Sequence, residues 1–475
     1  MYFAFLFILT AFIFKNAFLT YFFNDDFFFL KISRIDNIQK FVNFFSPIRH
    51  VSYKPVSQEI FYFLTHLFND NVYLAHLLIF LVYFIGLYYL YKIILNLTKN
   101  KSLSYLSTFF YAINFTHVFQ LYYLATFQDV AIFTFLCLAF YNYLKGNKLL
   151  SLIFFPLALL SKETAVLFVP FLILFKFIRG KKTNWSSLIS YVALGLVFIF
   201  LYQYSLKYVT SLDNYRIIFN PRLVANNALW YLLWSFGAPN FTSLYFTSIL
   251  KPPIPEFWKM LSNFPEIKIY FLLLTSYWTF FIISSVYFFV KKIPRLRFAS
   301  LEMTVGALFV YFFIFLGPIL FFEHRWMVRL AVPLIFIVLI QSFFILRLIE
   351  AGKMFRFIGY VLIGLYFIIQ LYGIPIHESS STFILESRFT KNAKAYFDKN
   401  KKEIVKHKYI YFVDKTKIVP MPWGGSEKLK VTLSDQNFLD HYFQNENIKA
   451  IYGFENKKIP PNSYIINSFD ILLPE

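Results

Sequence analysis

About eleven apolar segments follow one another along this chain, each long enough or nearly long enough to cross a membrane as a helix. The segments cover residues 2–23, 73–95, 103–121, 127–144, 149–161, 164–178, 187–209, 269–290, 302–322, 326–347 and 355–374. A bilayer core of about 30 Å needs about 20 apolar residues at 1.5 Å per residue, so 149–161 and 164–178 are of marginal length. The pattern predicts an all-α polytopic membrane protein with about eleven transmembrane helices.

The composition excludes an ordinary soluble globular protein. Hydrophobic residues make up 58% of the 475 residues, charged residues only 15%, and the mean hydropathy is +0.56. The single cysteine, Cys137, excludes a disulfide within the chain. A net charge of +21 is compatible with nucleic-acid binding, but the distribution of that charge indicates membrane topology instead. We therefore expect no nucleic-acid partner.

Basic residues predict the orientation of the segments. With the N-terminus in the cytoplasm, the inner loops carry about 16 basic and 2 acidic residues, against about 13 basic and 11 acidic residues outside. This bias holds only if 226–248, which contains Asn, Gly and Pro, does not cross the membrane and is instead a broken helix at the interface. The sequence thus predicts a multi-pass protein of the cell membrane whose C-terminal tail is extracytoplasmic.

The chain divides into a membrane domain, residues 1–375, and a small soluble α/β domain, residues 376–475. Charge rises and apolar runs shorten in the second part. Its pattern predicts a helix at 387–406 and short strands at 408–414, 428–434, 448–455 and 462–468. About 100 residues suffice for one such domain on the outer side.

Two adjacent acids, Asp25 and Asp26, follow the first apolar segment. Acids at a membrane boundary are costly if buried without a partner, so they are expected to be solvated or functional. They open the first outer loop, residues 24–72, which also contains Lys54 and an amphipathic stretch at 27–45. Cations that meet phosphate and acids that meet hydroxyl groups would suit an anionic lipid headgroup.

Other polar residues lie at the predicted outer ends of the apolar segments, where they can converge with the first loop. They are His76, His117, Gln128, Asp129, Lys162, Glu163, His324 and Arg325.

The order of these motifs resembles the C-type glycosyltransferase (GT-C) superfamily, near the dolichyl-phosphate-mannose–protein mannosyltransferases and their bacterial polyprenyl-linked-sugar relatives. The resemblance covers roughly residues 1–180. Its motifs are Asp25-Asp26, Tyr53-Lys54-Pro55, His76, Gln128-Asp129 and Leu160-Ser161-Lys162-Glu163-Thr164-Ala165. The chain departs from the family pattern at Lys54-Pro55, where Arg-Pro is common, and at Gln128, where relatives often carry a basic residue.

This resemblance implies transfer of a hexosyl or pentosyl group from a polyprenyl-phosphate donor to an acceptor hydroxyl of a protein, lipid or glycan on the outer side. The acceptor hydroxyl needs a base, for which we predict Asp25 or Asp26. The other acid would orient the acceptor or, with Asp129, bind a divalent cation; a cofactor is otherwise not expected. Predicted donor-phosphate contacts are Lys54, Lys162, His324 and Arg325. Predicted sugar, acceptor or supporting contacts are Asp129, Glu163, His117, His76 and Gln128.

Other interpretations stay open. The two acids could simply cap a helix, and the histidines could be packing residues. A transporter or flippase of lipid-linked glycans is the alternative function, although transporters favour charges at mid-span and here polar residues gather at the outer ends. A receptor or scaffold acting through its tail is a third. Membrane lipids are partners under every interpretation.

Overall fold

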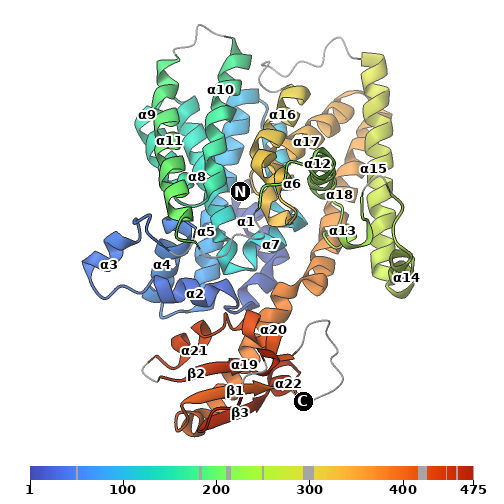
Figure 1. The fold of residues 1–475 in the computed structure, drawn as a ribbon. Coiled ribbons are helices and arrows are strands. Elements are labelled where there is room, and N and C mark those ends of the chain that lie inside the picture. Colours follow the sequence, from blue (N-terminus) through green and yellow to red (C-terminus); the bar gives the residue numbers. More distant parts are fainter. Residues whose placement is uncertain are drawn as a thin grey trace.

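The computed structural model describes residues 1–49, 52–180, 185–209, 216–248, 251–292, 304–415, 425–444, 447–455 and 458–473. The fold is a helical bundle with a small α/β unit at one end (Figure 1). We call this the domain end of the bundle. The basic clusters at 181–182 and 295–297, on which part of the predicted orientation depends, lie outside the described residues.

Five helices of the described chain are long and apolar enough to cross a membrane. They are α5 (Val72–Thr98), α8 (Phe127–Leu144, with the apolar run beginning at Leu124), α11 (Ser186–Leu206), α15 (Pro265–Lys292, apolar to Tyr287) and α18 (Lys353–Ser380). All five fall where the hydropathy predicted a span. This confirms a polytopic helical membrane protein, whereas the number of eleven spans stays a prediction.

The remaining apolar segments form shorter helices. These are α1 (Tyr2–Ile13), α6 (Lys101–Ala112), α9 (Lys148–Leu159), α10 (Phe168–Arg179), α16 (Val305–Leu316) and α17 (Leu334–Glu350). The predicted helix over 2–23 breaks after Ile13, and the short 3₁₀ helix η1 (Lys15–Leu19) follows. Within η1 the Asn16 side chain donates a 3.0 Å hydrogen bond to Glu378 on α18, so this polar group is satisfied inside the protein.

The segment with Asn, Gly and Pro forms short helices instead of one continuous span. They are α12 (Pro221–Ser235), which begins before this segment, and α13 (Thr242–Tyr245); α14 (Pro255–Asn263) follows the segment. Gly237 follows α12 with a φ of +105°, which favours glycine and turns the chain. The Asn227 amide donates to the backbone oxygens of Leu320 and Phe322, and so fixes α12 to a neighbouring loop.

The first loop folds at the domain end, beside the α/β unit (Figure 1). It contains α2 (Asp25–Ile32), α3 (Ile38–Asn43), the π-helical turn η2 (Val56–Ile60) and α4 (Phe61–Leu67). The amphipathic stretch is therefore two helices, not one. Of α2 and α3, the latter leaves the large apolar side chains of Ile38 and Val42 exposed, as expected for an interfacial helix.

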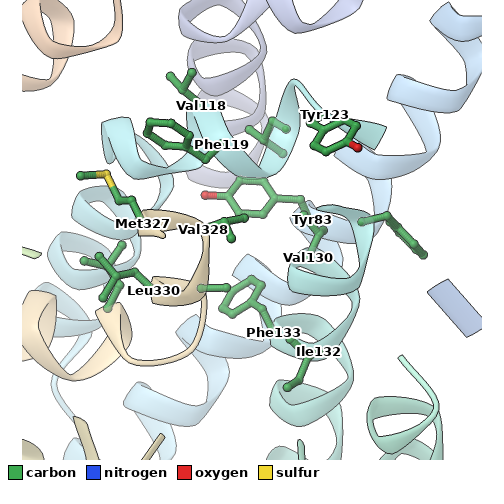
Figure 2. Close-up of a cluster of buried hydrophobic side chains, with 14 of the residues drawn as sticks. Tyr83, Val118, Phe119, Tyr123, Val130, Ile132, Phe133, Met327, Val328 and Leu330 are labelled. Carbon is green, nitrogen blue, oxygen red and sulfur yellow. The ribbon is translucent and has the colours of Figure 1, made fainter. Parts of the chain in front are cut away.

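A buried cluster of apolar side chains supports this end of the bundle. Figure 2 shows Val118, Phe119 and Tyr123, from the turns before α8, packed with Tyr83 and with residues of the loop before α17. The turns are η3 (Phe115–His117), α7 (Val118–Leu121) and η4 (Leu124–Thr126), and the loop contains η9 (Gly317–Phe321) and η10 (Met327–Leu330). This aromatic packing therefore holds the turns before α8 and the loop before α17 in place.

The C-terminal region is a three-stranded parallel sheet with helices. Its elements are α19 (Thr382–Ile404), β1 (Tyr409–Val413), α20 (Gly425–Thr432), α21 (Asn437–Tyr442), β2 (Lys449–Tyr452), η11 (Gly453–Glu455), β3 (Ser463–Asn467) and α22 (Ser468–Leu472). The strand order is β2-β1-β3, and Tyr411 lies opposite Ile451 and Ile465. The proposed boundary at residue 376 falls inside α18, which continues to Ser380.

The predicted strand at 428–434 is wrong, because this stretch forms most of α20. Leu429 and Leu433 are buried at helical spacing, while Val431 is exposed. A parallel connection from β1 to β2 requires a crossover, usually a helix, and α20 and α21 provide it. The predicted strands at 408–414, 448–455 and 462–468 and the helix at 387–406 correspond to β1, β2, β3 and α19.

Candidate functional site

The two adjacent acids meet different environments at the start of α2. Asp26 is fully buried; Tyr62 donates a 2.5 Å hydrogen bond to its Oδ1, and the Phe23 backbone donates a 3.0 Å bond to its Oδ2. Burial raises the pKa of Asp26 to about 8, against the lowering effect of these bonds. Asp26 therefore has a structural role and stabilises the first turn of α2.

Asp25 has an exposed side chain. Its backbone N–H donates a 3.2 Å hydrogen bond to the hydroxyl of Tyr123. Desolvation by the surrounding protein raises the pKa of the Asp25 carboxyl, while Tyr123 and the charge of Lys54 act in the opposite direction. Asp25 is thus the accessible carboxylate of the two.

Lys54 joins the first loop to two other predicted site residues. Its Nζ lies 2.9 Å from Gln128 Oε1 and 2.9 Å from Glu163 Oε2. Burial alone would raise the pKa of Glu163, but Lys54 and Lys162 outweigh it and lower the pKa to about 2. Glu163 is therefore ionised at any physiological pH.

A second ion pair lies beside the first. Lys162 Nζ is 2.5 Å from Asp129 Oδ1, and both side chains are buried. The other carboxylate oxygen of Asp129, Oδ2, is buried and accepts no hydrogen bond from the described residues. A buried carboxylate oxygen without a hydrogen bond lowers the stability of the fold. Such an oxygen is suited to accept a hydrogen bond from a hydroxyl group of a ligand.

Backbone contacts explain why residues over 100 positions apart meet here. The Val56 N–H donates to Leu160 O at 3.0 Å, and the Ser57 hydroxyl donates to Ser161 O at 2.7 Å. The start of η2 is thereby fixed to the turn that precedes η5 (Glu163–Leu167). Lys54 on one side and Lys162-Glu163 on the other are consequently held in reach of α8.

The structure brings together six of the eleven predicted residues. Lys54, Gln128, Asp129, Lys162 and Glu163 form one polar cluster, and Asp25 is within electrostatic reach of Lys54. We call these six residues the polar cluster.

The two predicted histidines belong to the packed framework. Both are fully buried. The ring nitrogens of His76 contact Thr20 Oγ1 at 2.8 Å and Leu121 O at 3.1 Å, and those of His117 contact Gln120 Oε1 at 2.6 Å and Tyr111 O at 2.7 Å. With both nitrogens of each ring occupied, we do not assign them to the site.

Of the predicted pair His324 and Arg325, Arg325 lies against α12, and His324 contacts its own loop. The Arg325 guanidinium is 5.8 Å from the ring centroid of Trp230, and the His324 backbone oxygen accepts a 2.8 Å hydrogen bond from Arg329. The sequence analysis missed Arg329, which is buried, because it stands inside an apolar run. No described contact links these cations to the polar cluster.

The predicted metal ligands do not form a common set. The oxygens of Asp26 are occupied by Tyr62 and Phe23, and Asp129 is paired with Lys162. Throughout the described ranges, no group of three His, Cys, Asp or Glu side chains is placed to hold a metal ion.

Tyr62 and Tyr123 are the residues that the sequence analysis missed beside the acids. Their hydroxyl groups contact Asp26 and the backbone of Asp25. The chain contains 35 tyrosines, so nothing in the sequence distinguishes these two.

Fold and site together define a polytopic helical membrane protein with a charged polar cluster at the domain end of its bundle. Residues 54–205 match the family model of the dolichyl-phosphate-mannose-protein mannosyltransferases. This match confirms the resemblance to the membrane glycosyltransferases of the GT-C superfamily. It begins at Lys54 and includes the four cluster residues on α8 and in the turn at 162–163. No curated protein matches the chain.

Proposed function

We propose that this protein transfers a sugar from a polyprenyl-phosphate donor to an acceptor hydroxyl on the extracytoplasmic face, with Asp25 as the general base. The observation that carries this proposal is the polar cluster, in which an accessible carboxylate lies within electrostatic reach of Lys54. Asp25 removes the proton of the acceptor hydroxyl as its oxygen bonds to the anomeric carbon. The bond from that carbon to the phosphate oxygen breaks, and polyprenyl phosphate leaves.

Lys54 is the proposed contact for the donor phosphate. The leaving group carries its negative charge away without a proton, so a nearby cation lowers the barrier. Lys54 is held by Gln128 and Glu163 on the exposed side of the cluster, and 31% of the Glu163 side chain is exposed. A phosphate that replaces Glu163 as the partner of Lys54 would leave the lysine in place.

Asp129 is the proposed contact for a sugar hydroxyl. Its Oδ2 lacks a hydrogen bond from the described residues, whereas Oδ1 is occupied by Lys162. Lys162 is then a positioning residue that orients the carboxylate of Asp129. We do not include Arg325, which lies against Trp230 of α12, or His324, which contacts its own loop.

The decisive experiment replaces each acid in turn. Purified Asp25→Asn and Asp26→Asn proteins are assayed in lipid nanodiscs with labelled polyprenyl-phosphate hexose and a membrane extract as the acceptor source. Asp25→Asn should lower transfer by about 10² to 10⁴-fold, the usual contribution of a general base.

The matched control is Asp36→Asn, which removes an exposed acid of the same loop that pairs with Lys40. It should transfer at the wild-type rate. Full transfer by Asp25→Asn would refute the assignment of the base. Movement of labelled lipid across the bilayer without loss of its sugar would instead support the flippase alternative.

A further inference from the structure

The C-terminal domain is docked directly onto the segment that carries Asp25. The Tyr21 N–H donates a 2.6 Å hydrogen bond to Ser387 Oγ on α19, and the Asn24 N–H donates a 2.7 Å bond to Thr432 O on α20. Two different helices of the domain therefore hold the backbone on the N-terminal side of the acids.

The backbone at Asn24 needs such support. Its φ of +51° lies in the left-handed region, which is uncommon for a residue with a side chain. Conformations of this kind persist only where the surrounding structure imposes them. At Asn24 this support is the hydrogen bond to Thr432 of the C-terminal domain. At the next residue, the hydroxyl of Tyr123 accepts a hydrogen bond from the Asp25 N–H.

A buried ion pair lies at the same junction. Glu386 on α19 and Lys428 on α20 contact each other, with side-chain exposures of 7% and 3%. Burial raises the pKa of Glu386, Lys428 lowers it, and the charge of Asp25 raises it again. Glu386 directly precedes Ser387, and Lys428 lies four residues, about one helical turn, before Thr432. The pair therefore joins α19 and α20 at the places where these helices hold residues 21–24.

We propose that the C-terminal domain is part of the catalytic machinery: the Glu386–Lys428 pair and the Asn24–Thr432 hydrogen bond hold Asp25 in its working orientation toward the acceptor. This inference rests on the proposed function, in which Asp25 is the base. Glu386 and Lys428 are positioning residues, because they act through Asp25 and its backbone. Donor binding is assigned to Lys54 of the first loop and not to a residue of the domain, so the domain governs turnover more than donor affinity.

The test uses the full-length protein with polyprenyl-phosphate hexose as the donor. Glu386→Gln and Lys428→Met should each lower kcat by about tenfold or more, since small misplacements of a reacting group are costly. The KM for the donor should change little. Lys394→Met is the matched control, because its pair with Asp398 on the same helix is exposed, and its kcat should equal that of the wild type.

The pH profile separates positioning from general damage. The groups that face Asp25 are Asp26, Tyr62, Tyr123, Lys54 and Glu386. Glu386→Gln removes a negative charge that acts on Asp25, so the acid limb of the kcat profile should move to lower pH. Lys428→Met leaves the negative charge of Glu386 without its counter-ion, so the acid limb should move to higher pH. Unchanged kcat and unchanged profiles in both variants would overturn the inference.

Unpairing a buried charge is destabilising, so a single variant can fail to fold. The double variant Glu386→Gln/Lys428→Met then replaces it, since it leaves neither charge buried alone. A lowered kcat with the donor KM retained supports positioning, and wild-type kcat refutes it. If Asp25→Asn keeps full transfer, the proposed function itself fails; if Asp25→Asn is inactive while the pair variants are normal, only the role of the domain fails.

Discussion

At the scale of single residues, the neighbouring carboxylates of Asp25 and Asp26 differ in exposure and in hydrogen bonding, because their surroundings differ. Asp26 is buried between Tyr62 and the backbone of Phe23, whereas Asp25 is exposed and close to Lys54. A general base must be accessible to its substrate, whereas a structural carboxylate must keep its protein hydrogen bonds and not exchange them for water. Environment therefore divides the two acids into a proposed base and a structural support.

A pH-dependent stability follows from the burial of Asp26. Its pKa is about 8 in the folded protein and near 3.8 in the unfolded chain. Stability from this group is therefore fully present below pH 4 and is lost as the pH rises through 8, because the folded state binds the proton more tightly. Asp26→Asn should flatten the fall of the thermal midpoint between pH 5 and 8, measured in one detergent. Equal slopes for variant and wild type would contradict this prediction.

Close helix packing decides the arrangement of the bundle at the element scale. Helices α5 and α8 meet at Gly86, where an added Cβ would lie 2.4 Å from Phe133 Cε1 and 2.6 Å from Thr134 Oγ1. Small residues allow membrane helices to approach closely. The position of α8, and with it Gln128 and Asp129 at its first turn, depends on this contact.

Gly86→Ala should therefore destabilise the protein by about 1–3 kcal/mol, the cost of overpacking a filled interface. The measurement is the thermal midpoint in detergent. Gly364→Ala is the matched control, since a Cβ on this α18 glycine meets nothing within 4 Å. The control should be neutral or slightly stabilising, because alanine favours a helix over glycine. A Gly86→Ala midpoint equal to that of the control would disprove the packing argument.

The first loop and the C-terminal domain form one continuous structure at the scale of the whole molecule. Phe27 on α2 is fully buried and its ring packs 5.0 Å from that of Phe438 on α21. Lys31 and Asp440 form an exposed ion pair at 2.7 Å across the same junction. Apolar burial, not the surface charge, should dominate this docking.

Phe27→Ala should loosen the domain, at a cost of about 3–5 kcal/mol for a buried aromatic side chain. Limited proteolysis should then release fragments of the C-terminal domain faster than in the wild type. Lys31→Met, which removes only the exposed pair, should change the rate little, because such pairs contribute at most about 1 kcal/mol. If Lys31→Met released C-terminal fragments faster than Phe27→Ala, the surface ion pair and not apolar burial would dominate the docking.

Sequence patterns predicted those features that depend on local physics. The runs at 73–95 and 127–144 predicted α5 and α8, because a membrane-spanning helix satisfies its hydrogen bonds within itself. The stretch at 428–434 was misassigned as a strand, because seven residues with alternating apolar positions fit either structure. The crossover that decides between them is a property of the whole sheet.

By itself, the sequence determined a polytopic helical protein and the residue types of its site, since hydropathy, charge and short motifs are properties of neighbouring residues. Only the tertiary structure decided which residues meet. Lys54 and Glu163 are joined by packing between distant segments, and Arg325 lies against Trp230 of α12. The same holds for Glu386 and Lys428 beside Asp25, since charges over 350 residues away in the chain reach it only through folding.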